Sequence, residues 1–346
     1  MSITADGALR QCFEEREKAT LSRHAALACE SRGRAVPEPE HDYRTAFQRD
    51  RDRILHSKAF RRLKQKTQVF LAPEGAHYRT RLTHTLEVAQ IARTASRALF
   101  LNEDLAEAIA LGHDLGHTPF GHAGEMVLDE AYPGGFNHSE QSLRIVEVLE
   151  RRRHGEGLNL TWEVRDGIRN HSHAKCILAG ERPGEPISCE AMVVSLSDAI
   201  AYINHDIDDA LRGGVITESD LPSDCLDILG RTSSVRIDAM VRALIHGSRD
   251  GRIDMTPEIR EATQALRLHL YTHLYPCEAI SKEIRKAQKI LRELYDYLIV
   301  HPTPETPPPR SEDPEGRNVV DFIAGMTDDF ALQLYERLFF PAPWRP

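Results

Sequence analysis

The sequence predicts an all-α protein, a helical bundle with additional C-terminal helices. Apolar residues recur at helical spacing through most of the 346 residues, and the sequence contains neither a run of alternating strands nor an internal repeat. Stretches rich in Pro, Gly and charge are predicted loops at 31–43, 180–187 and 301–316. We therefore expect an N-terminal segment (1–43), a core (44–211) and a C-terminal helical region (212–346) with a Pro-rich linker near 301–316.

The first helices of the core are predicted by apolar stripes and capping residues. One helix carries an apolar stripe made of Leu82, Leu86, Ala89, Ala92 and Leu99. Asn102 is a favourable N-cap for the next helix. That helix carries its own apolar residues, Leu105, Ile109 and Leu111, up to His113.

Later helices are predicted by their start signals. Thr118 followed by Pro119 is typical of a cap and first helical position, and Asn137 with Glu140 imitates a capping box. Helical periodicity returns over 255–300 and 318–340. The C-terminal region is therefore expected to be helical as well.

Composition narrows the class of protein. The 41% hydrophobic content is ordinary for a soluble globular chain, no apolar run approaches the length of a membrane span, and the first residues lack a signal pattern. Six cysteines occur without a CxxC pair, which argues against a zinc ribbon or redox motif. The formal charge of -9 speaks against wholesale coating of nucleic acid. We expect a cytoplasmic protein without a membrane partner.

One segment is locally basic despite this charge. Nine Lys or Arg residues lie between Arg44 and Lys66, against two aspartates. They could form a solvated helix face, or part of the segment could meet a polyphosphate, because guanidinium groups bind phosphate oxygens in a bidentate manner. The position of the segment just before His84 favours the second reading.

A set of metal-ligand residues is the most informative feature of the chain. His113 and Asp114 are adjacent and follow an apolar helix in the run EAIALGHDLGHTPFG, while His84 lies upstream and Asp198 downstream. Two imidazoles and two carboxylates suit a divalent ion such as Mn, Mg, Fe, Co, Ni or Zn. An isolated His-Asp pair would be weak evidence, but the four residues together predict a site for one divalent metal ion.

The order His84, His113-Asp114, Asp198 resembles that of the HD phosphohydrolase superfamily, and the surrounding sequence segments resemble its bacterial deoxyguanosinetriphosphate triphosphohydrolase-like branch. The matching segments are RRLKQKTQVF (61–70), YRTRLTHTLEVA (78–89), HDLGHTPFGHAGE (113–125), FNHSEQSLR (136–144), LNLTWEVRDGIRNH (158–171) and DAIAYINHDIDD (198–209). They cover most of residues 44–211. The resemblance implies an HD-domain helical bundle over this core, with His84, His113, Asp114 and Asp198 as the metal ligands.

The residues also offer a general acid. A 5'-alkoxide is a poor leaving group, and His122 and Glu125 stand at i, i+3 helical spacing shortly after the His-Asp pair. The resemblance implies that His122 is the catalytic acid and that Glu125 orients it. The alternative is that His122 only caps the turn after Pro119.

The resemblance further implies contacts to a nucleotide substrate. Arg81 and His138 would lie on the phosphate side, Gln68 near the sugar 3'-hydroxyl, and His117 near the phosphate or sugar. Tyr202 would pack under the deoxyribose, on one helix face with Asp198, His205 and Asp209. Each of these could instead be a structural hydrogen-bonding residue. His138 and His171 could supply a second metal, but one metal is favoured; His205, Asp206 and Asp209 have no assigned role.

The function implied is a metal-dependent deoxynucleoside triphosphate triphosphohydrolase, which yields deoxynucleoside and intact triphosphate. An HD-type 5'-nucleotidase or phosphodiesterase is the alternative enzyme. A nucleotide sensor or single-strand nucleic-acid binder with a residual site is disfavoured, because all six metal and acid residues are present. The resemblance also implies deoxynucleoside triphosphates as activators and a homo-oligomer, a hexamer or tetramer, with contacts expected around 266–275.

Overall fold

The computed structural model describes residues 8–68, 79–153, 155–181 and 188–341. Within these ranges the regular structure is almost all helical, and the only strands are a two-residue antiparallel pair, β1 (Arg151–Arg152) and β2 (Gly155–Glu156). The prediction of an all-α protein is confirmed. No helix in the described part of the chain is both long and apolar enough to cross a membrane.

The helices of the N-terminal and core regions are α1 (Ala8–Thr20), η1 (Ala28–Glu30), α2 (Ala46–Leu55), α3 (Lys58–Arg62), η2 (Leu63–Gln65), α4 (Arg81–Ala98), α5 (Glu103–Gly112), α6 (His122–Ala131), α7 (His138–Arg144), η3 (Ile145–Leu149), α8 (Trp162–Arg169), η4 (His171–His173), α9 (Ala174–Leu178) and α10 (Cys189–Arg212). Those that follow are η5 (Glu218–Asp220), α11 (Ser223–Leu229), α12 (Ser233–Gly247), α13 (Pro257–His269), η6 (Leu270–Leu274), α14 (Glu278–Val300), α15 (Arg317–Ala324) and α16 (Asp328–Phe339). Of the η elements, η3 and η6 are π-helical and the others are 3-10 helices.

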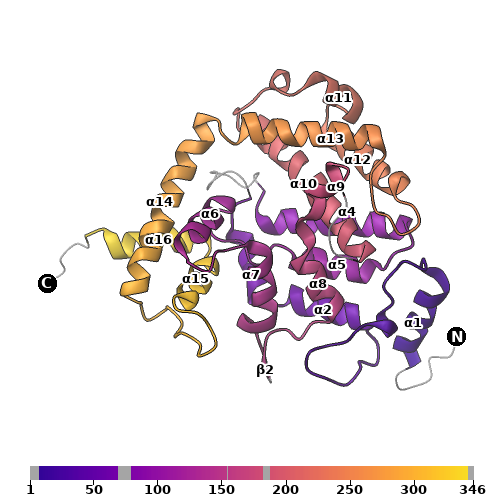
Figure 1. The fold of residues 1–346 in the computed structure, drawn as a ribbon, viewed down its shortest axis with the longest axis horizontal. Helices are drawn as coiled ribbons and strands as arrows, with labels where there is room; N and C mark the ends of the chain where they lie inside the picture. The colour runs from indigo at the N-terminus through magenta and orange to yellow at the C-terminus, as the bar shows by residue number, and fades with distance from the viewer. Residues whose placement is uncertain (1–7, 69–78, 154, 182–187, 342–346) are drawn as a thin grey trace.

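The central helix of the bundle is α10, which packs against α4, α5 and α12 (Figure 1). Its apolar residues are buried on all sides, among them Val194, Leu196, Ile200, Ile203 and Ile207. A helix that buries apolar residues on most of its faces lies inside a protein. The packing of α10 against α4, α5 and α12 therefore fixes the position of its polar residues, including the partly exposed Asp198.

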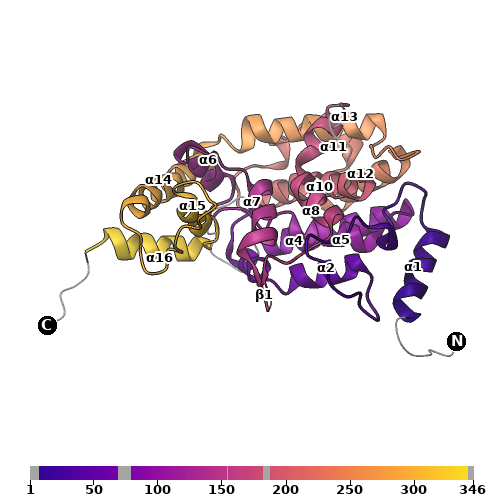
Figure 2. The same ribbon diagram turned by 60° about the horizontal axis from the view of Figure 1, so that its bottom comes forward.

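The C-terminal helices form a second packed group at one end of the molecule. Figures 1 and 2 show α14, α15 and α16 together at this end with α6 beside them, while α1 lies at the opposite end. The larger hydrophobic core runs through α2, α4, α5, α8, α10 and α13. A separate core joins α6 to the last three helices through Leu128, Leu291, Val320 and Leu334. The helix that carries His122 and Glu125 is thus anchored by the C-terminal region.

Several predicted details agree with the structure. Asn102 caps α5, since its side chain accepts a hydrogen bond from Leu105 N, and Asn137 caps α7 through Ser139 N and Glu140 N. The stretches 31–43 and 301–316 contain no helix. Of the predicted loop 180–187, residues 182–187 lie outside the described residues, as do Val69, Phe70 and Tyr78 of the quoted segments.

The predicted helix start at Thr118 is wrong, because α6 begins at His122. Phe120 and Gly121 have φ of 61° and 58°, values that a right-handed helix does not admit. The Phe120 amide donates to Asp328 Oδ1 (3.0 Å), 208 residues away. Thr118 closes the turn by donating from Oγ1 to Gly121 O (2.8 Å). A tertiary hydrogen bond therefore overrides the local start signal.

One further expectation needs correction. Leu86 of the predicted stripe is 48% exposed, and the buried apolar face of α4 is formed by Val88, Ala89, Ile91, Ala92 and Ala95. The helices expected over 255–300 and 318–340 are present as α13 and α14, separated by η6, and as α15 and α16.

Candidate metal centre

The four predicted metal ligands come together from three helices. His84 lies in the first turn of α4, His113 and Asp114 follow the end of α5, and Asp198 lies in the middle of α10. Asp198 Oδ1 is 3.0 Å from His84 Nε2 and 3.8 Å from His113 Nε2, and Asp114 Oδ1 is 3.4 Å from His113 Nε2. The packing of α4 and α5 on α10 thus converts residues up to 114 positions apart into one donor cluster.

The orientation of His113 fits a metal ligand. Its Nδ1 donates to the carbonyl oxygen of Ala110 (2.6 Å), which fixes the proton on Nδ1 and leaves a lone pair on Nε2. That Nε2 is buried and has no hydrogen-bond partner among the described residues. A buried polar atom without a partner is costly, and a metal ion at the cluster would supply the missing partner.

The two carboxylates are held in the charged form that metal binding requires. Burial alone would raise the pKa of Asp114, but His113, His117 and Arg81 outweigh burial and keep the pKa well below its usual range. Burial likewise opposes ionisation of Asp198, and the contact with His84 lowers the pKa of that carboxyl. Two imidazoles with two carboxylates are a donor set that borderline divalent ions accept, so the residues present fit such an ion.

Arg81 and Gln68 lie beside this cluster with unused hydrogen-bonding atoms. Arg81 donates from Nη1 to Asp114 Oδ2 (2.8 Å), and its buried Nε has no partner among the described residues. The buried Oε1 of Gln68 also lacks one. Gly121 adjoins both residues, and a methyl group there would lie 2.7 Å from Arg81 Nη2. The two predicted substrate contacts therefore lie together, and Arg81 also orients Asp114.

A second group of side chains adjoins the cluster through His117. Its Nε2 is 3.3 Å from Asp114 Oδ1, and its ring stacks on that of His138 with 4.1 Å between centroids. Burial, with the positive charge of Arg81, keeps the pKa of His117 well below its usual range. His117 is therefore a neutral imidazole that joins the metal cluster to the residues around α6.

Glu125 holds the candidate acid and a second histidine. His122 is at the first position of α6 with its side chain 71% exposed, and its Nδ1 is 3.0 Å from Glu125 Oε2. Glu125 Oε1 accepts from the His138 backbone N (2.9 Å) and is 2.9 Å from His138 Nδ1. Burial would raise the pKa of Glu125, but the contacts with His122 and His138 outweigh it and lower that pKa strongly. The structure places Glu125 where it orients both imidazoles.

His171, named above with His138 as a source of a second metal site, lies within the same region. Its Nδ1 donates to Ile168 O (2.8 Å), and its Nε2 is 3.2 Å from His138 Nε2. Ligand atoms of Asp114, His138 and His171 lie within 4.8 Å of one another. The donors for a second ion are close enough, although His138 Nδ1 is already held by Glu125.

The structure gives His205, which had no assigned role, a position behind His84. His205 Nδ1 is 3.3 Å from His84 Nδ1, and His205 Nε2 is 2.5 Å from Glu87 Oε2. A proton on His84 Nδ1 donated to His205 leaves the lone pair of His84 Nε2 facing Asp198. The sequence did not reveal the link, although Glu87 follows His84 by three residues, a spacing that puts both on one side of α4.

Tyr202 and Asp206 contact residues that sequence reasoning missed. Arg267 on α13 donates from Nε to the Tyr202 hydroxyl (2.7 Å), and the Tyr275 hydroxyl donates to Asp206. Burial raises the pKa of Asp206 to about 7. The segment 266–275, expected at an oligomer contact, therefore also reaches inward to α10. Asp209 contacts Arg79 instead (3.1 Å).

Most of the basic segment Arg44–Lys66 is engaged inside the protein. On α2 and beside it, the ion pairs are Arg44–Asp52, Arg49–Glu38, Arg51–Asp104 and Arg53–Glu38. Lys66 is buried, and its Nζ donates to the carbonyl oxygens of His117 and of Ala324 (2.8 Å). These five residues serve chiefly to hold the fold together, which weakens the polyphosphate interpretation for them, while Lys58, Arg61, Arg62 and Lys64 are exposed.

Comparison with protein families gives the class. Residues 81–203 match the HD domain, and residues 253–337 match the phosphohydrolase-associated domain. The first range contains all four residues of the donor cluster, and the fold is the helical one expected of an HD domain. The protein is an HD-domain hydrolase, a metal-dependent phosphohydrolase.

Three curated relatives are similar over almost the whole chain, and each is described as a deoxyguanosinetriphosphate triphosphohydrolase-like protein. They come from Caldanaerobacter subterraneus subsp. tengcongensis (55% identity, 97% of each chain), Desulfatibacillum aliphaticivorans (50%, covering 97% of this chain and 99% of the relative) and Clostridium perfringens (44%, covering 96% and 98%). The chain belongs to the deoxyguanosinetriphosphate triphosphohydrolase-like family. A hypothetical protein of known structure from Aquifex aeolicus is only weakly similar, with a TM-score of 0.48 at 19% identity over 84% of this chain and 71% of that one.

Proposed function

We propose that the protein is a deoxynucleoside triphosphate triphosphohydrolase, which converts a dNTP and water into a deoxynucleoside and triphosphate. The observation that carries the proposal is the juxtaposition of two clusters. One is the His84–His113–Asp198 group with Asp114, whose Oδ1 is 3.4 Å from His113 Nε2, and the other is the His122–Glu125–His138 group, which His117 joins to Asp114. One cluster suits a metal ion and the other suits proton transfer. The names of the relatives support the same reaction class.

The four donors would hold one divalent ion. When bound, such an ion lowers the pKa of water and polarises a phosphoryl oxygen. Arg81 keeps Asp114 charged and in place, and His205 keeps the lone pair of His84 Nε2 directed at the centre. Among the four donors, Asp198 has the most exposed side chain, at 23%. A substrate therefore approaches from the side of α10 on which Asp198 is open to solvent.

His122 is the proposed acid. In the reaction the water oxygen would form a bond to the α-phosphorus and release a proton to solvent, from which His122 is later reprotonated, and the bond from that phosphorus to the sugar 5'-oxygen would break. His122 then gives its Nε2 proton to the 5'-oxygen, while Glu125 stabilises the imidazolium through Nδ1. To reach the 5'-oxygen of a substrate, the His122 side chain must be exposed to solvent, and it is.

The remaining substrate residues are proposed contacts. Arg81 Nε and Gln68 Oε1 are buried atoms without hydrogen-bond partners in the described structure. A phosphate oxygen could accept from the first and a sugar hydroxyl could donate to the second. His138 and neutral His117 would face the phosphates. Tyr202 would limit the space beside the deoxyribose, held there by Arg267.

The test is product analysis on purified, Mn-loaded protein. Each dNTP is incubated alone and in mixtures, and products are separated by anion exchange. We expect deoxynucleoside and intact triphosphate with the parent protein, and no turnover with Asp114→Ala. Asp224→Ala, a change of the same size at an exposed position on α11, serves as the matched control and should be active.

One observation favours an alternative reaction. The arginines of α2 are engaged in internal ion pairs and so do not supply triphosphate contacts. An HD-type 5'-nucleotidase or phosphodiesterase needs fewer phosphate contacts. Turnover of nucleoside monophosphates or diesters, without turnover of any dNTP alone or mixed, would replace the triphosphohydrolase proposal with this one.

Three further expectations accompany the proposal. We expect one metal ion per chain, measured by elemental analysis. We expect some dNTPs to be hydrolysed only in the presence of another, as activation requires, and the same mixtures test this. We expect a homo-oligomer, a hexamer or tetramer, which light scattering coupled to size exclusion will show.

A further inference from the structure

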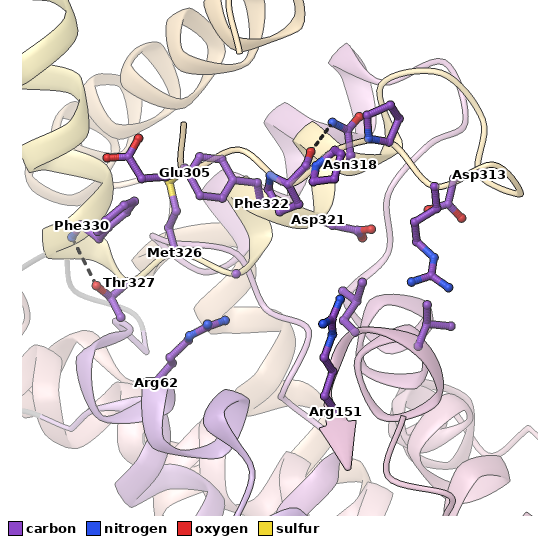
Figure 3. A pocket seen from close by; sticks show the side chains of 17 residues that line it. Arg62, Arg151, Glu305, Asp313, Asn318, Asp321, Phe322, Met326, Thr327 and Phe330 are labelled. Carbon is purple, nitrogen blue, oxygen red and sulfur yellow. Dashed lines mark hydrogen bonds between the residues drawn. The ribbon is translucent and has the colours of Figure 1, made fainter. Parts of the chain in front are cut away.

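A groove separate from the metal centre lies between the core and the C-terminal helices. It has a volume of about 590 Å³, within the range that small-molecule sites occupy. One wall comes from the core, at the end of α3 and around β1, and the other from the Pro-rich linker, α15 and the start of α16 (Figure 3). None of the residues placed above in the metal centre or its substrate contacts lines it.

The three arginines and three carboxylates that line the groove are not paired with one another. The carboxylates are all paired within the protein: Asp313 and Asp321 with Arg144, and Glu305 with Arg337 (2.9 Å). Arg310 is paired with Glu156 (2.6 Å). Arg62 and Arg151 remain, and neither side chain has a hydrogen bond or ion pair among the described residues. The groove therefore presents two guanidinium groups that no described carboxylate contacts directly, although Glu156, whose pKa is lowered chiefly by Arg310, lies near enough to Arg151 for that guanidinium to lower the pKa as well.

These two groups face an apolar wall. Arg62 and Arg151 rise from the core side, and the side chains of Phe322, Met326 and Phe330 lie on the opposite side of the groove in Figure 3. The two phenylalanine rings are nearly perpendicular, with centroids 6.2 Å apart. Three consecutive prolines, 307–309, extend the apolar surface.

We propose that this groove binds a phosphorylated small molecule that carries a planar ring. Guanidinium groups bind phosphate oxygens in a bidentate, charge-assisted manner, which assigns the phosphate to Arg62 and Arg151. A flat ring gains contact area on aromatic side chains whatever its hydrogen-bonding pattern, which assigns the ring to Phe322 and Phe330. Charge complementarity and the mixed lining together identify the occupant as a nucleotide-like molecule.

The floor of the groove is connected to the metal centre by hydrogen bonds. Gly325, Met326 and Thr327 line the groove, and the residues on either side of them reach into the core. Ala324 O accepts from Lys66 Nζ, which also donates to His117 O. Asp328 accepts from Thr67 N (2.9 Å) and from Phe120 N (3.0 Å). A ligand in the groove therefore touches the short segment that holds the 117–120 loop.

The first test locates the ligand by hydrogen–deuterium exchange on the full chain. The probes are ATP, GTP and inorganic tripolyphosphate, each titrated to saturation. We expect the two nucleotides to protect peptides from 148–151 and 318–330, with a smaller change in 117–121. The readout is protection at named peptides, so it is independent of turnover and of the reaction proposed for the metal centre. Tripolyphosphate should bind at least tenfold more weakly, because it lacks the ring.

The second test removes the charges one at a time. Arg62→Gln and Arg151→Gln should each weaken nucleotide protection of the groove by roughly tenfold or more, as loss of a charge-assisted hydrogen bond implies. Both side chains are exposed, so both variants should fold. Arg242→Gln is the matched control, since it removes an exposed arginine that is paired with Asp238 on α12 and does not line the groove, and the affinity should change less than about twofold.

Three results would overturn the proposal. The groove peptides could stay unprotected by either nucleotide, or protection could persist unchanged in Arg62→Gln and Arg151→Gln. Tripolyphosphate could bind as tightly as ATP and GTP, which would leave the apolar wall without a role. Self-association that both variants abolish, without nucleotide protection, would instead assign the groove to a second copy of the chain.

Discussion

Replacement of His205 by Phe tests whether this residue positions a metal ligand. The change keeps a buried ring of similar size and removes both ring nitrogens, so His84 Nδ1, 3.3 Å away, loses its partner. An unpartnered buried donor costs about 1–3 kcal/mol, and loss of such outer partners typically lowers metal affinity by roughly 10- to 100-fold. We expect the Kd for Mn to rise by that factor.

The assay is calorimetric titration of metal-free protein with Mn, which does not depend on catalysis. Glu87→Gln is the graded comparison: it keeps the size of the side chain and a hydrogen-bonding oxygen beside His205 and removes only the charge, so the Kd should rise by only about two- to fivefold. Circular dichroism and thermal melting establish that both variants are folded. A folded His205→Phe protein whose Kd for Mn stays within about twofold of the parent would refute the positioning role.

Three other changes give separate measurements. His122→Gln should lower turnover by roughly 10²- to 10⁴-fold while elemental analysis still finds the parent amount of metal, and loss of metal along with turnover would contradict its role as acid. Burial raises the pKa of Glu190 to about 7 from an ordinary value of 4.5, so the folded state holds the proton more tightly than the unfolded state. The unfolding free energy should therefore fall by about 3 kcal/mol as pH rises from 4.5 to 7, and urea denaturation of Glu190→Gln should show no such fall. Burial lowers the pKa of Lys66 to about 7 from 10.5, so the unfolded state binds more protons above pH 7. Stability should then rise by about 1.4 kcal/mol per pH unit between pH 7.5 and 9, and an unchanged slope in Lys66→Met would assign the rise to other groups.

Much of the fold and of the donor cluster could be predicted because the signals are local. Asn102 and Asn137 cap the helices that follow them, and a cap acts on amides two or three residues away. His113 and Asp114 are adjacent in the chain, so they necessarily enter one site together. His84 and Asp198 were placed with them by resemblance, and the structure brings all four side chains together.

The missed contacts join residues that no local pattern relates. Arg267 reaches Tyr202 across 65 positions, and Asp328 reaches the Phe120 amide across 208. The second contact also explains the wrong helix start at Thr118, because the Phe120 amide, from which a capping Thr118 side chain would have accepted a hydrogen bond, is bonded to a distant carboxylate. For the same reason, the groove could not be predicted. Its two walls come from segments more than 150 residues apart, and the arginines that lack an ion-pair partner are known only once every neighbouring ion pair is known.

The hydrogen bonds of Lys66 and Asp328 have a consequence for the order in which the protein matures. The loop beside the metal centre is fixed by Ala324 and by Asp328, and Asp328 follows Phe120 by 208 residues in the chain. A nascent chain folds from its N-terminus as it is made, so α4, α5 and α10 can pack long before these residues exist. The donor cluster would then assemble early in synthesis, while the loop from His117 to Phe120 would stay unfixed until residues 324–328 have been made. A nascent chain that lacks those residues would bind metal before it could hydrolyse a substrate.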